Sequence, residues 1–218
     1  MTTKIIAHLH ANEPNADATG PWGKWAPHYD TLLRLVTLGR ERTLREMTVA
    51  LAQIKPGDKV LEVGCGTGTL SMAAKTRVGP LGEVYGIDAA PEMIEVARKK
   101  ASQANMDVVF REGQIENISF PDNQFDVVLC SFMVFVITND IRRKGFQEIH
   151  RTLKPNGQLL VLDFSPPANI LLSHLVTLIF GRQHTLQRIL PIMEEAGFKD
   201  IEIRETNLAV LSFLRGTK

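Results

Sequence analysis

A glycine-rich turn contains the residues best suited to ligand chemistry. It spans Val60 to Leu70 and reads VLEVGCGTGTL, with Gly64, Gly66 and Gly68 at the spacing G-x-G-x-G. Glycine lets a backbone approach a ligand closely and adopt φ values that other residues avoid. In a parallel sheet, a loop of this kind at the first strand-to-helix turn lies where nucleosides and dinucleotides bind. The turn therefore predicts a ligand that contains a nucleoside.

Two details separate a dinucleotide from another nucleoside. The dinucleotide fingerprint is G-x-G-x-x-G, whereas here position 69 is Thr. Glu62 lies on the strand itself, two residues before the first glycine, where an unpaired carboxylate is costly. It would repel a pyrophosphate but attract a cation, such as the ammonium or sulfonium of S-adenosylmethionine. The alternative for Glu62 is a salt bridge to a nearby Lys or Arg.

Asp88 ends the second predicted strand, at 83–88, and lies in the segment VYGIDAAPEMI. An acidic residue about 20 positions past the glycine loop is placed to accept hydrogen bonds from both ribose hydroxyls. An aspartate here could instead cap the helix that follows. Taken with the loop and Glu62, Asp88 favours a ribose-binding role.

The rest of the chain alternates strands and helices, as a parallel sheet requires. Strands are predicted at 59–63, 83–88, 108–110, 125–131, 158–164, 201–206 and 209–214, and helices at 40–54, 69–78, 91–104, 139–153 and roughly 168–197. This alternation indicates βαβ units in an α/β fold. The last two strands are separated by a short turn, so we expect an antiparallel pair at one edge of the sheet.

Composition limits the class of protein. The 218 residues suffice for one substantial domain, and 25 Lys+Arg balance 24 Asp+Glu, which argues against general affinity for nucleic acid. Cys65 and Cys130 are far apart and lack metal-ligand spacing, so we expect reduced thiols, no metal and a cytoplasmic location. The start MTTKIIAHLH has no long apolar core.

Four motifs in order resemble those of the class I S-adenosylmethionine-dependent methyltransferases. They are VLEVGCGTGTL, GIDAAPEMIEVARKK, FPDNQFDVVLCSFMVF and IHRTLKPNGQLLVLDFS, within about residues 41 to 206. The chain is most similar to the ubiquinone/menaquinone-biosynthesis methyltransferases and their small-molecule and lipid relatives. The resemblance implies a Rossmann-like, doubly wound sheet of seven mostly parallel strands, in the order 3-2-1-4-5-7-6 with strand 7 antiparallel. It also implies an N-terminal arm or lid at 1–40 and the methyltransferase domain at 41–218.

The resemblance implies S-adenosylmethionine as cofactor and assigns residues to it. These are Tyr29, Glu62, Gly64, Cys65, Gly66, Gly68, Asp88, Ala89, Met93, Gln114, Ile115, Ser131 and Phe132. Glu62 would anchor the amino group and Asp88 the ribose, while Tyr29 would close over the cofactor from the arm. Gln114 stands where the family often has an acidic residue facing the adenine amino group, and its carbonyl can accept the same hydrogen bond. Ser131 and Phe132 would border the methyl group.

Methyl transfer from a sulfonium needs alignment of nucleophile, methyl and sulfur, and exclusion of water. A general base is required only when the acceptor must lose a proton, as a phenol or a quinol ring carbon does. Weak candidates for such a base are His28, Tyr29, Asp163 and His174. The sequence does not select one of them.

The acceptor is expected to be small and apolar or lipid-like, such as a quinone precursor. The segment SPPANILLSHLVTLIFGRQ at 165–183 is apolar nearly all round. It is either a helix packed on the core or at a homodimer interface, or an acceptor pocket or lipid-facing segment. The basic stretch at 141–154 either adds attraction to anionic headgroups, giving peripheral membrane contact, or forms a solvated face.

Three rival functions remain open at this stage. One is a phospholipid headgroup N-methyltransferase, which composition does not separate from a quinone enzyme. Another is an NAD-dependent oxidoreductase, against which the glycine spacing and Glu62 argue. The third is a binding module that keeps the fold without transferring a methyl group.

Overall fold

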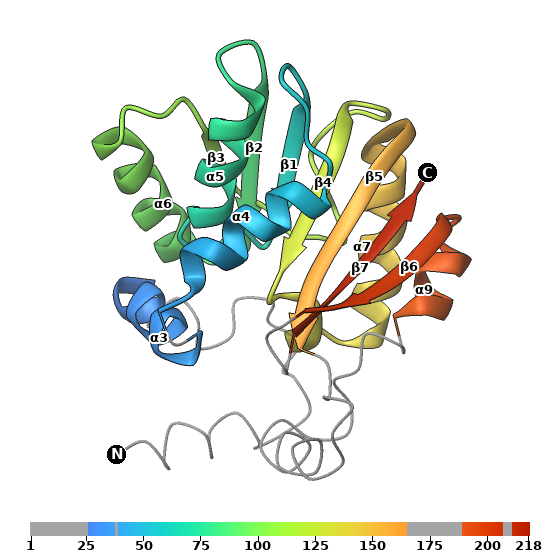
Figure 1. Cartoon of the computed structure of the whole chain (residues 1–218). Coiled ribbons are helices and arrows are strands. Elements are labelled where there is room, and N and C mark those ends of the chain that lie inside the picture. The colour runs from blue at the N-terminus through green and yellow to red at the C-terminus, as the bar shows by residue number, and fades with distance from the viewer. Residues whose placement is uncertain (1–25, 38, 165–188, 207–210) are drawn as a thin grey trace, which may run out of the picture.

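Seven strands, in the order β3-β2-β1-β4-β5-β7-β6, form one sheet with helices on both faces (Figure 1). The computed structural model describes residues 26–37, 39–164, 189–206 and 211–218. The strands are β1 (Lys59–Val63), β2 (Glu83–Asp88), β3 (Val109–Glu112), β4 (Phe125–Ser131), β5 (Leu153–Phe164), β6 (Lys199–Glu205) and β7 (Leu211–Thr217). The helices are η1 (Ala26–His28), α3 (Tyr29–Val36), α4 (Glu41–Leu51), α5 (Thr69–Val78), α6 (Pro91–Gln103), η2 (Val134–Val136), α7 (Asn139–Thr152) and α9 (Leu190–Glu195).

The strand order and the orientation of β7 confirm the predicted topology. β1 pairs in parallel with β2 and β4, and β4 pairs in parallel with β5. β7 is antiparallel to both β5 and β6. The carboxyl ends of β1, β2 and β4 therefore meet at one edge of the sheet, where α3 also lies (Figure 1).

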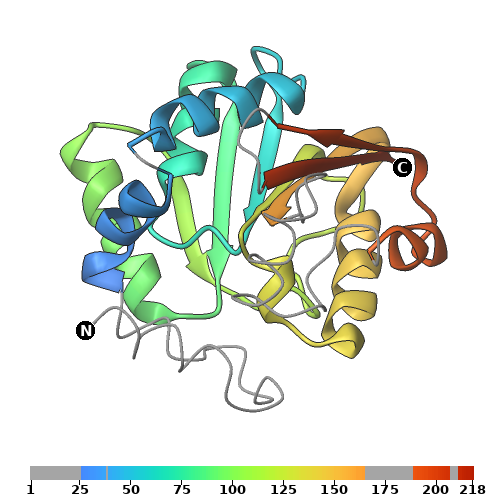
Figure 2. The ribbon, with the colours of Figure 1, turned by 60° about the horizontal axis from the view of Figure 1, so that its bottom comes forward.

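The alternation of side chains along each strand divides the core into two layers. On one face, Val60 and other strand residues pack against buried side chains of α4 and α5. On the opposite face, Leu61 and Val63 belong to a cluster that includes Phe146 and Ile149 of α7 and residues of α9. Figure 2 shows these helices on either side of the sheet. A strand covered on both faces is apolar without alternation, as β4 is.

The strand boundaries that differ most from the prediction are those of β5 and β7, whereas the ends of β3 and β6 shift by only one or two residues. β5 begins at Leu153 rather than at 158, because Leu153 pairs with Phe125 ahead of a register shift in β4. β7 runs to Thr217, which pairs with Gln158, so it lies later than the predicted 209–214. The helix predicted at roughly 168–197 is described only as α9, and its remainder lies outside the described residues. Within the described ranges, no helix has the length and apolarity needed to cross a bilayer.

The arginines of α7 are engaged within the protein. Arg151 forms ion pairs with Glu148 and Asp122 at 2.8 and 2.6 Å. Arg143 forms one with Glu195 of α9 at 3.2 Å. These ion pairs already engage part of the positive charge of the basic stretch.

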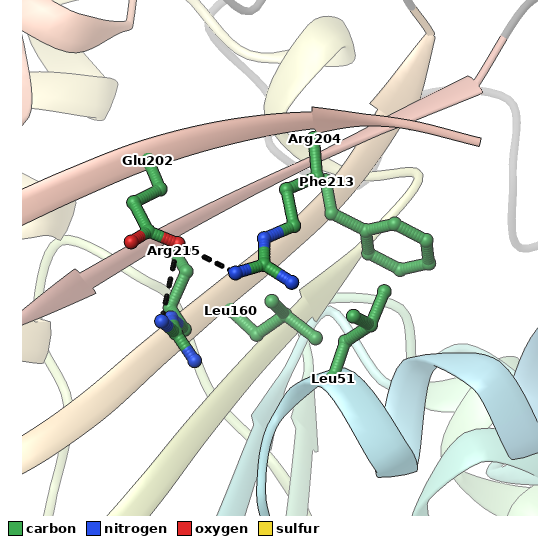
Figure 3. Close-up of a pocket in the computed structure, with 6 residues that line it drawn as sticks. All are labelled: Leu51, Leu160, Glu202, Arg204, Phe213 and Arg215. Atoms are coloured by element: carbon green, nitrogen blue, oxygen red, sulfur yellow. Dashed lines mark hydrogen bonds and ion pairs between the residues drawn. The ribbon is translucent and has the colours of Figure 1, made fainter.

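A shallow hollow lies on the α4 side of β5, β6 and β7 (Figure 3). Its lining residues are Leu51, Leu160, Glu202, Arg204, Phe213 and Arg215. Glu202 accepts hydrogen bonds from Arg204 and Arg215 at 3.2 and 3.1 Å. The arginine stems can cover apolar surface while their charged ends stay in water. None of the lining residues belongs to the glycine turn, so this hollow is separate from the predicted ligand site.

Candidate cofactor site

The glycine turn joins β1 to α5 and has the backbone conformation its composition predicts. Gly64, Gly66 and Gly68 have φ values of +71°, +51° and +77°. A Cβ at Gly64 would lie 2.6 Å from Met133, and one at Gly68 would lie 2.6 Å from the Phe110 ring. At Gly66 the nearest atom would be a Tyr29 ring carbon at 3.8 Å. Two of the glycines are thus required by packing, whereas the middle one leaves open space.

Asp88 at the end of β2 ties the glycine turn to the neighbouring strand. Its carboxylate accepts hydrogen bonds from the backbone N–H of Gly66 at 2.8 Å and of Ala90 at 2.9 Å. The second bond reaches the N–H of Ala90, the N-cap residue of α6, and this helix receives no side-chain cap hydrogen bond, so the alternative capping role for Asp88 is not observed. Burial raises the pKa of Asp88 above its ordinary value, and these backbone N–H groups oppose the rise. A carboxylate has about four lone-pair sites, so acceptor capacity remains for ribose hydroxyls.

Glu62 is a buried carboxylate on the face of the sheet that α4 and α5 cover. Only 1% of it is exposed. Ser71 donates a hydrogen bond to Oε2 at 2.5 Å, and Ser131 donates a longer one to Oε1 at 3.4 Å. Burial raises the pKa of Glu62 to about 7, although the Ser71 hydrogen bond and the charge of Arg45 lower it. Among the described residues Glu62 has no ion-pair partner within 4.0 Å, so the alternative of a direct salt bridge is not observed.

Helix α3 lies over the glycine turn and is fastened there by Asp30. This carboxylate accepts hydrogen bonds from Thr67 of the turn at 2.5 Å and from Lys100 of α6 at 2.6 Å. The fastening places the Tyr29 ring beside Gly66. Burial raises the pKa of Tyr29 to about 12, with further contributions from the nearby acidic groups, Asp88 first among them.

Some of the other predicted cofactor residues lie near the glycine turn, whereas Gln114 lies on the surface and Ile115 lies in the core. Met93 packs in a small cluster with Ala90 and Tyr29, and Ser131 bonds to Glu62, so both lie near the glycine turn. Cys65 is buried within the turn, Ala89 is half-buried, and Phe132 has a φ of +55° directly after β4. Gln114 is exposed and bridges to Asn117, while Ile115 packs against Gly145 in the α7 layer of the core.

The candidate bases are not gathered at one point. His28 is exposed on η1, and Tyr29 follows it beside the glycine turn. Asp163 is 2% exposed and accepts a hydrogen bond from the backbone N–H of Phe135 at 3.0 Å, which holds η2 in place. His174 lies outside the described residues.

Sequence reasoning missed Arg45. It lies on the buried face of α4 with Leu44, Thr48 and Val49, and only 7% of it is exposed. Its Nη1 donates a hydrogen bond to Ser131 at 3.3 Å. The available signal was position, because Arg45 is four residues from Val49 and so shares the apolar stripe of the helix.

Comparison with known proteins places this geometry in a family. A family model described as a methyltransferase domain matches residues 60–157. Demethylmenaquinone methyltransferase from Deinococcus radiodurans is 37% identical over 164 residues, which are 75% of this chain and 66% of that protein. 2-phytyl-1,4-naphtoquinone methyltransferase from Nostoc punctiforme is 32% identical over 177 residues, 80% of this chain and 74% of that protein.

Solved structures share the fold. A SAM-dependent methyltransferase from Aquifex aeolicus matches with a TM-score of 0.71, covering 89% of this chain and 97% of that one at 22% identity. The sheet order and the strand-to-helix glycine turn are those of the Rossmann-like fold that class I methyltransferases have. The chain belongs to the S-adenosylmethionine-dependent methyltransferases, in the ubiquinone/menaquinone group. It spans slightly less than two thirds of the curated relatives it matches first, 66% and 63% of their lengths.

The residues present fit S-adenosylmethionine, the cofactor of this family. The open position at Gly66 allows close approach of a ligand, and Asp88 beside it retains acceptor capacity for ribose hydroxyls. Among the residues that the structure describes, the buried Glu62 carboxylate has no direct cationic partner, which suits the ligand's ammonium group. Each of these features is a property of the described side chains and backbone.

Proposed function

We propose that the protein methylates a ring carbon of a quinone-type acceptor, with S-adenosylmethionine as the methyl donor. The observation that carries this proposal is the convergence of the glycine turn, Glu62 and Asp88 at the carboxyl ends of β1 and β2. The acceptor class is supported by relatives named for demethylmenaquinone and phytylnaphtoquinone. Carbon as the methylated atom is supported by a 35% identical relative from Ectopseudomonas mendocina, named ubiquinone/menaquinone biosynthesis C-methyltransferase.

In this proposal the protein acts mainly by binding and orientation. The bound cofactor supplies a methyl group that its sulfonium already activates for displacement. Asp88 holds the ribose, Glu62 holds the ammonium, and the backbone at Gly66 permits close contact. Because the Tyr29 pKa is about 12, its phenol stays protonated near neutral pH and can donate a hydrogen bond rather than act as a base. Precise positioning of nucleophile and methyl supplies much of the rate enhancement in such a reaction.

We also propose that the arm at 1–40 acts as a lid on this site. Support comes from its described part, residues 26–37, in which α3 is fastened over the glycine turn through Asp30. Residues 1–25 and 38 of the arm lie outside the described residues.

The acceptor class is tested with S-adenosylmethionine labelled in the methyl group. Purified protein is incubated with a reduced prenyl-1,4-naphthoquinone that lacks the ring methyl, and in parallel with phosphatidylethanolamine vesicles. Label in a new methyl group bonded to the quinol ring, absent with the Asp88→Ala variant, supports the proposal. Label only in phospholipid would replace the quinone acceptor by the headgroup N-methyltransferase alternative, and no transfer to either acceptor would contradict both.

A further inference from the structure

We propose that Arg45 binds the carboxylate of the cofactor's methionine moiety, opposite Glu62. This inference rests on the proposed use of S-adenosylmethionine and names a contact within its site. It makes Arg45 a binding residue, so its effect should appear in ligand affinity without any acceptor present.

The first observation is that Arg45 is buried without a matching anion. Only 7% of the residue is exposed, and its Nε has no hydrogen-bond partner among the described residues. It belongs to none of the ion pairs within 4.0 Å in that part of the chain. Its one hydrogen bond in the described structure goes to the neutral hydroxyl of Ser131. A buried guanidinium is costly unless a charge pairs with it, so the arrangement indicates a missing anionic ligand.

The second observation is the location of this guanidinium. Ser131 is the last residue of β4, at the edge of the sheet where the glycine turn lies. Helix α4 begins near this edge, beside α3 (Figure 1). Arg45 therefore faces the ends of the strands that form the cofactor site, and its charge contributes to lowering the pKa values of both Glu62 and Tyr29.

The third observation is the pairing of opposite charges across one hydroxyl. Ser131 accepts a hydrogen bond from Arg45 at 3.3 Å and donates one to Glu62 at 3.4 Å. The cationic and the anionic side chain are thus neighbours that do not neutralise each other directly. An α-amino acid carries its ammonium and its carboxylate on a single carbon, so it presents two opposite charges close together. Glu62 and Arg45 match that pattern, and guanidinium groups pair well with carboxylates.

An ionised oxygen of the acceptor could in principle use the same guanidinium. The cofactor carboxylate is favoured because Arg45 shares Ser131 with Glu62, the residue assigned to the ammonium on the same cofactor carbon. The two possible anions can be distinguished by experiment. Only a contact with the cofactor carboxylate makes Arg45 necessary for binding the cofactor in the absence of an acceptor.

The test is calorimetric titration of the ligand-free protein with two nucleosides. One is S-adenosylhomocysteine, and the other is its decarboxylated counterpart, S-adenosyl-3-thiopropylamine, which keeps the amine. Arg45→Met should weaken binding of the first at least tenfold and change binding of the second less than about twofold, because charge-assisted hydrogen bonds to the carboxylate are lost. Arg45→Lys should fall between, since lysine keeps the charge without the fork geometry.

Arg42→Met is the matched control on the same helix. The side chain of Arg42 is 88% exposed and pairs with Glu46 one turn away, so both ligands should bind this variant as they bind the wild type. Equal weakening of both ligands by Arg45→Met, or unchanged binding of S-adenosylhomocysteine, would overturn the inference. Unchanged binding with slower transfer to the acceptor would assign Arg45 to the acceptor instead. If the wild type bound neither nucleoside, the proposed function itself would fail.

A second measurement guards against a folding defect. The thermal midpoint of ligand-free Arg45→Met should equal or exceed that of the wild type, because a buried charge without an ionic partner is removed. The increase in midpoint on adding S-adenosylhomocysteine should be smaller than in the wild type. A large drop in the ligand-free midpoint, repeated in Arg45→Lys, would show a structural role and contradict the inference.

Discussion

Replacing Glu62 by Gln should change how the stability of the ligand-free protein depends on pH. Burial raises the pKa of this carboxyl from 4.5 to about 7. The folded state therefore keeps the Glu62 proton at pH values where the unfolded chain releases it. The resulting stability is fully present below the unfolded pKa and is lost as pH rises through the folded one.

The magnitude follows from the same two pKa values. At about 1.36 kcal/mol for each unit of pKa, the difference corresponds to roughly 3 kcal/mol. Glu62 is 1% exposed, so screening by solvent reduces this figure little. Glutamine keeps the shape but carries no charge at any of these pH values. The free energy of unfolding of Glu62→Gln, minus that of the wild type, should increase by roughly 3 kcal/mol between about pH 4.5 and pH 7.5.

Urea denaturation of both proteins, at intervals from about pH 4.5 to pH 8, measures this difference in the free energy of unfolding. The contributions of the titratable groups that both proteins share cancel in the difference. Glu148→Gln is the control, since its hydrogen bond to Arg151 lowers the Glu148 pKa. Stability from Glu148 is present above its unfolded pKa and lost as pH falls, so its difference curve should be flat across the upper part of the range. If the free energies of unfolding of the wild type and of Glu62→Gln changed in parallel from pH 4.5 to pH 7.5, the assignment of a buried carboxyl group with a raised pKa would be refuted.

Three further predictions test the site in other ways. Asp88→Ala should weaken S-adenosylhomocysteine binding more than tenfold in calorimetry, because charge-assisted hydrogen bonds to the ribose are lost; an unchanged dissociation constant would remove Asp88 from the ribose site. Gly64→Ala should lower the free energy of unfolding by about 2–4 kcal/mol in urea, since a φ of +71° is strained for alanine and its Cβ would lie 2.6 Å from Met133; Gly79→Ala, at the same φ with nothing within 4 Å, should be milder, and equal losses would contradict the packing argument. Asp30→Ala should change stability by about 1 kcal/mol or less, because its side chain is 46% exposed, while the dissociation rate of S-adenosylhomocysteine in stopped-flow measurements rises severalfold; an unchanged rate would argue against the lid.

Much of the fold was predictable because local patterns and topology rules agree. The glycine turn, the apolar run at β4 and the proline at the start of α6 each mark an element from sequence alone. The seven-strand order came from family resemblance and was confirmed. The start of β5 was missed because the pairing of Leu153 with Phe125 depends on a register shift, which has no local signal. Helix α3 was missed because no element was predicted for the part of the arm or lid between residue 25 and the helix at 40–54.

The site was predicted where function leaves a mark in local sequence and missed where it depends on tertiary packing. Glu62 stood out as a carboxylate within an apolar strand, and the structure shows it buried and bonded to serines. Arg45 shares the buried side of α4 with Leu44 and Val49, but this position alone does not say what an arginine there would contact, and its hydrogen bond to Ser131 joins residues 86 positions apart. The fastening of Asp30 to Lys100 joins residues 70 positions apart, a contact that no short motif can encode.

Parallel calorimetric titrations with S-adenosylhomocysteine and NAD test the central claim most directly. That claim is that the glycine turn, Glu62 and Asp88 together form a site for the methyl donor rather than for a dinucleotide. Micromolar binding of S-adenosylhomocysteine with no heat from NAD is the predicted result. Binding of NAD alone would contradict the interpretation of both Glu62 and the glycine spacing.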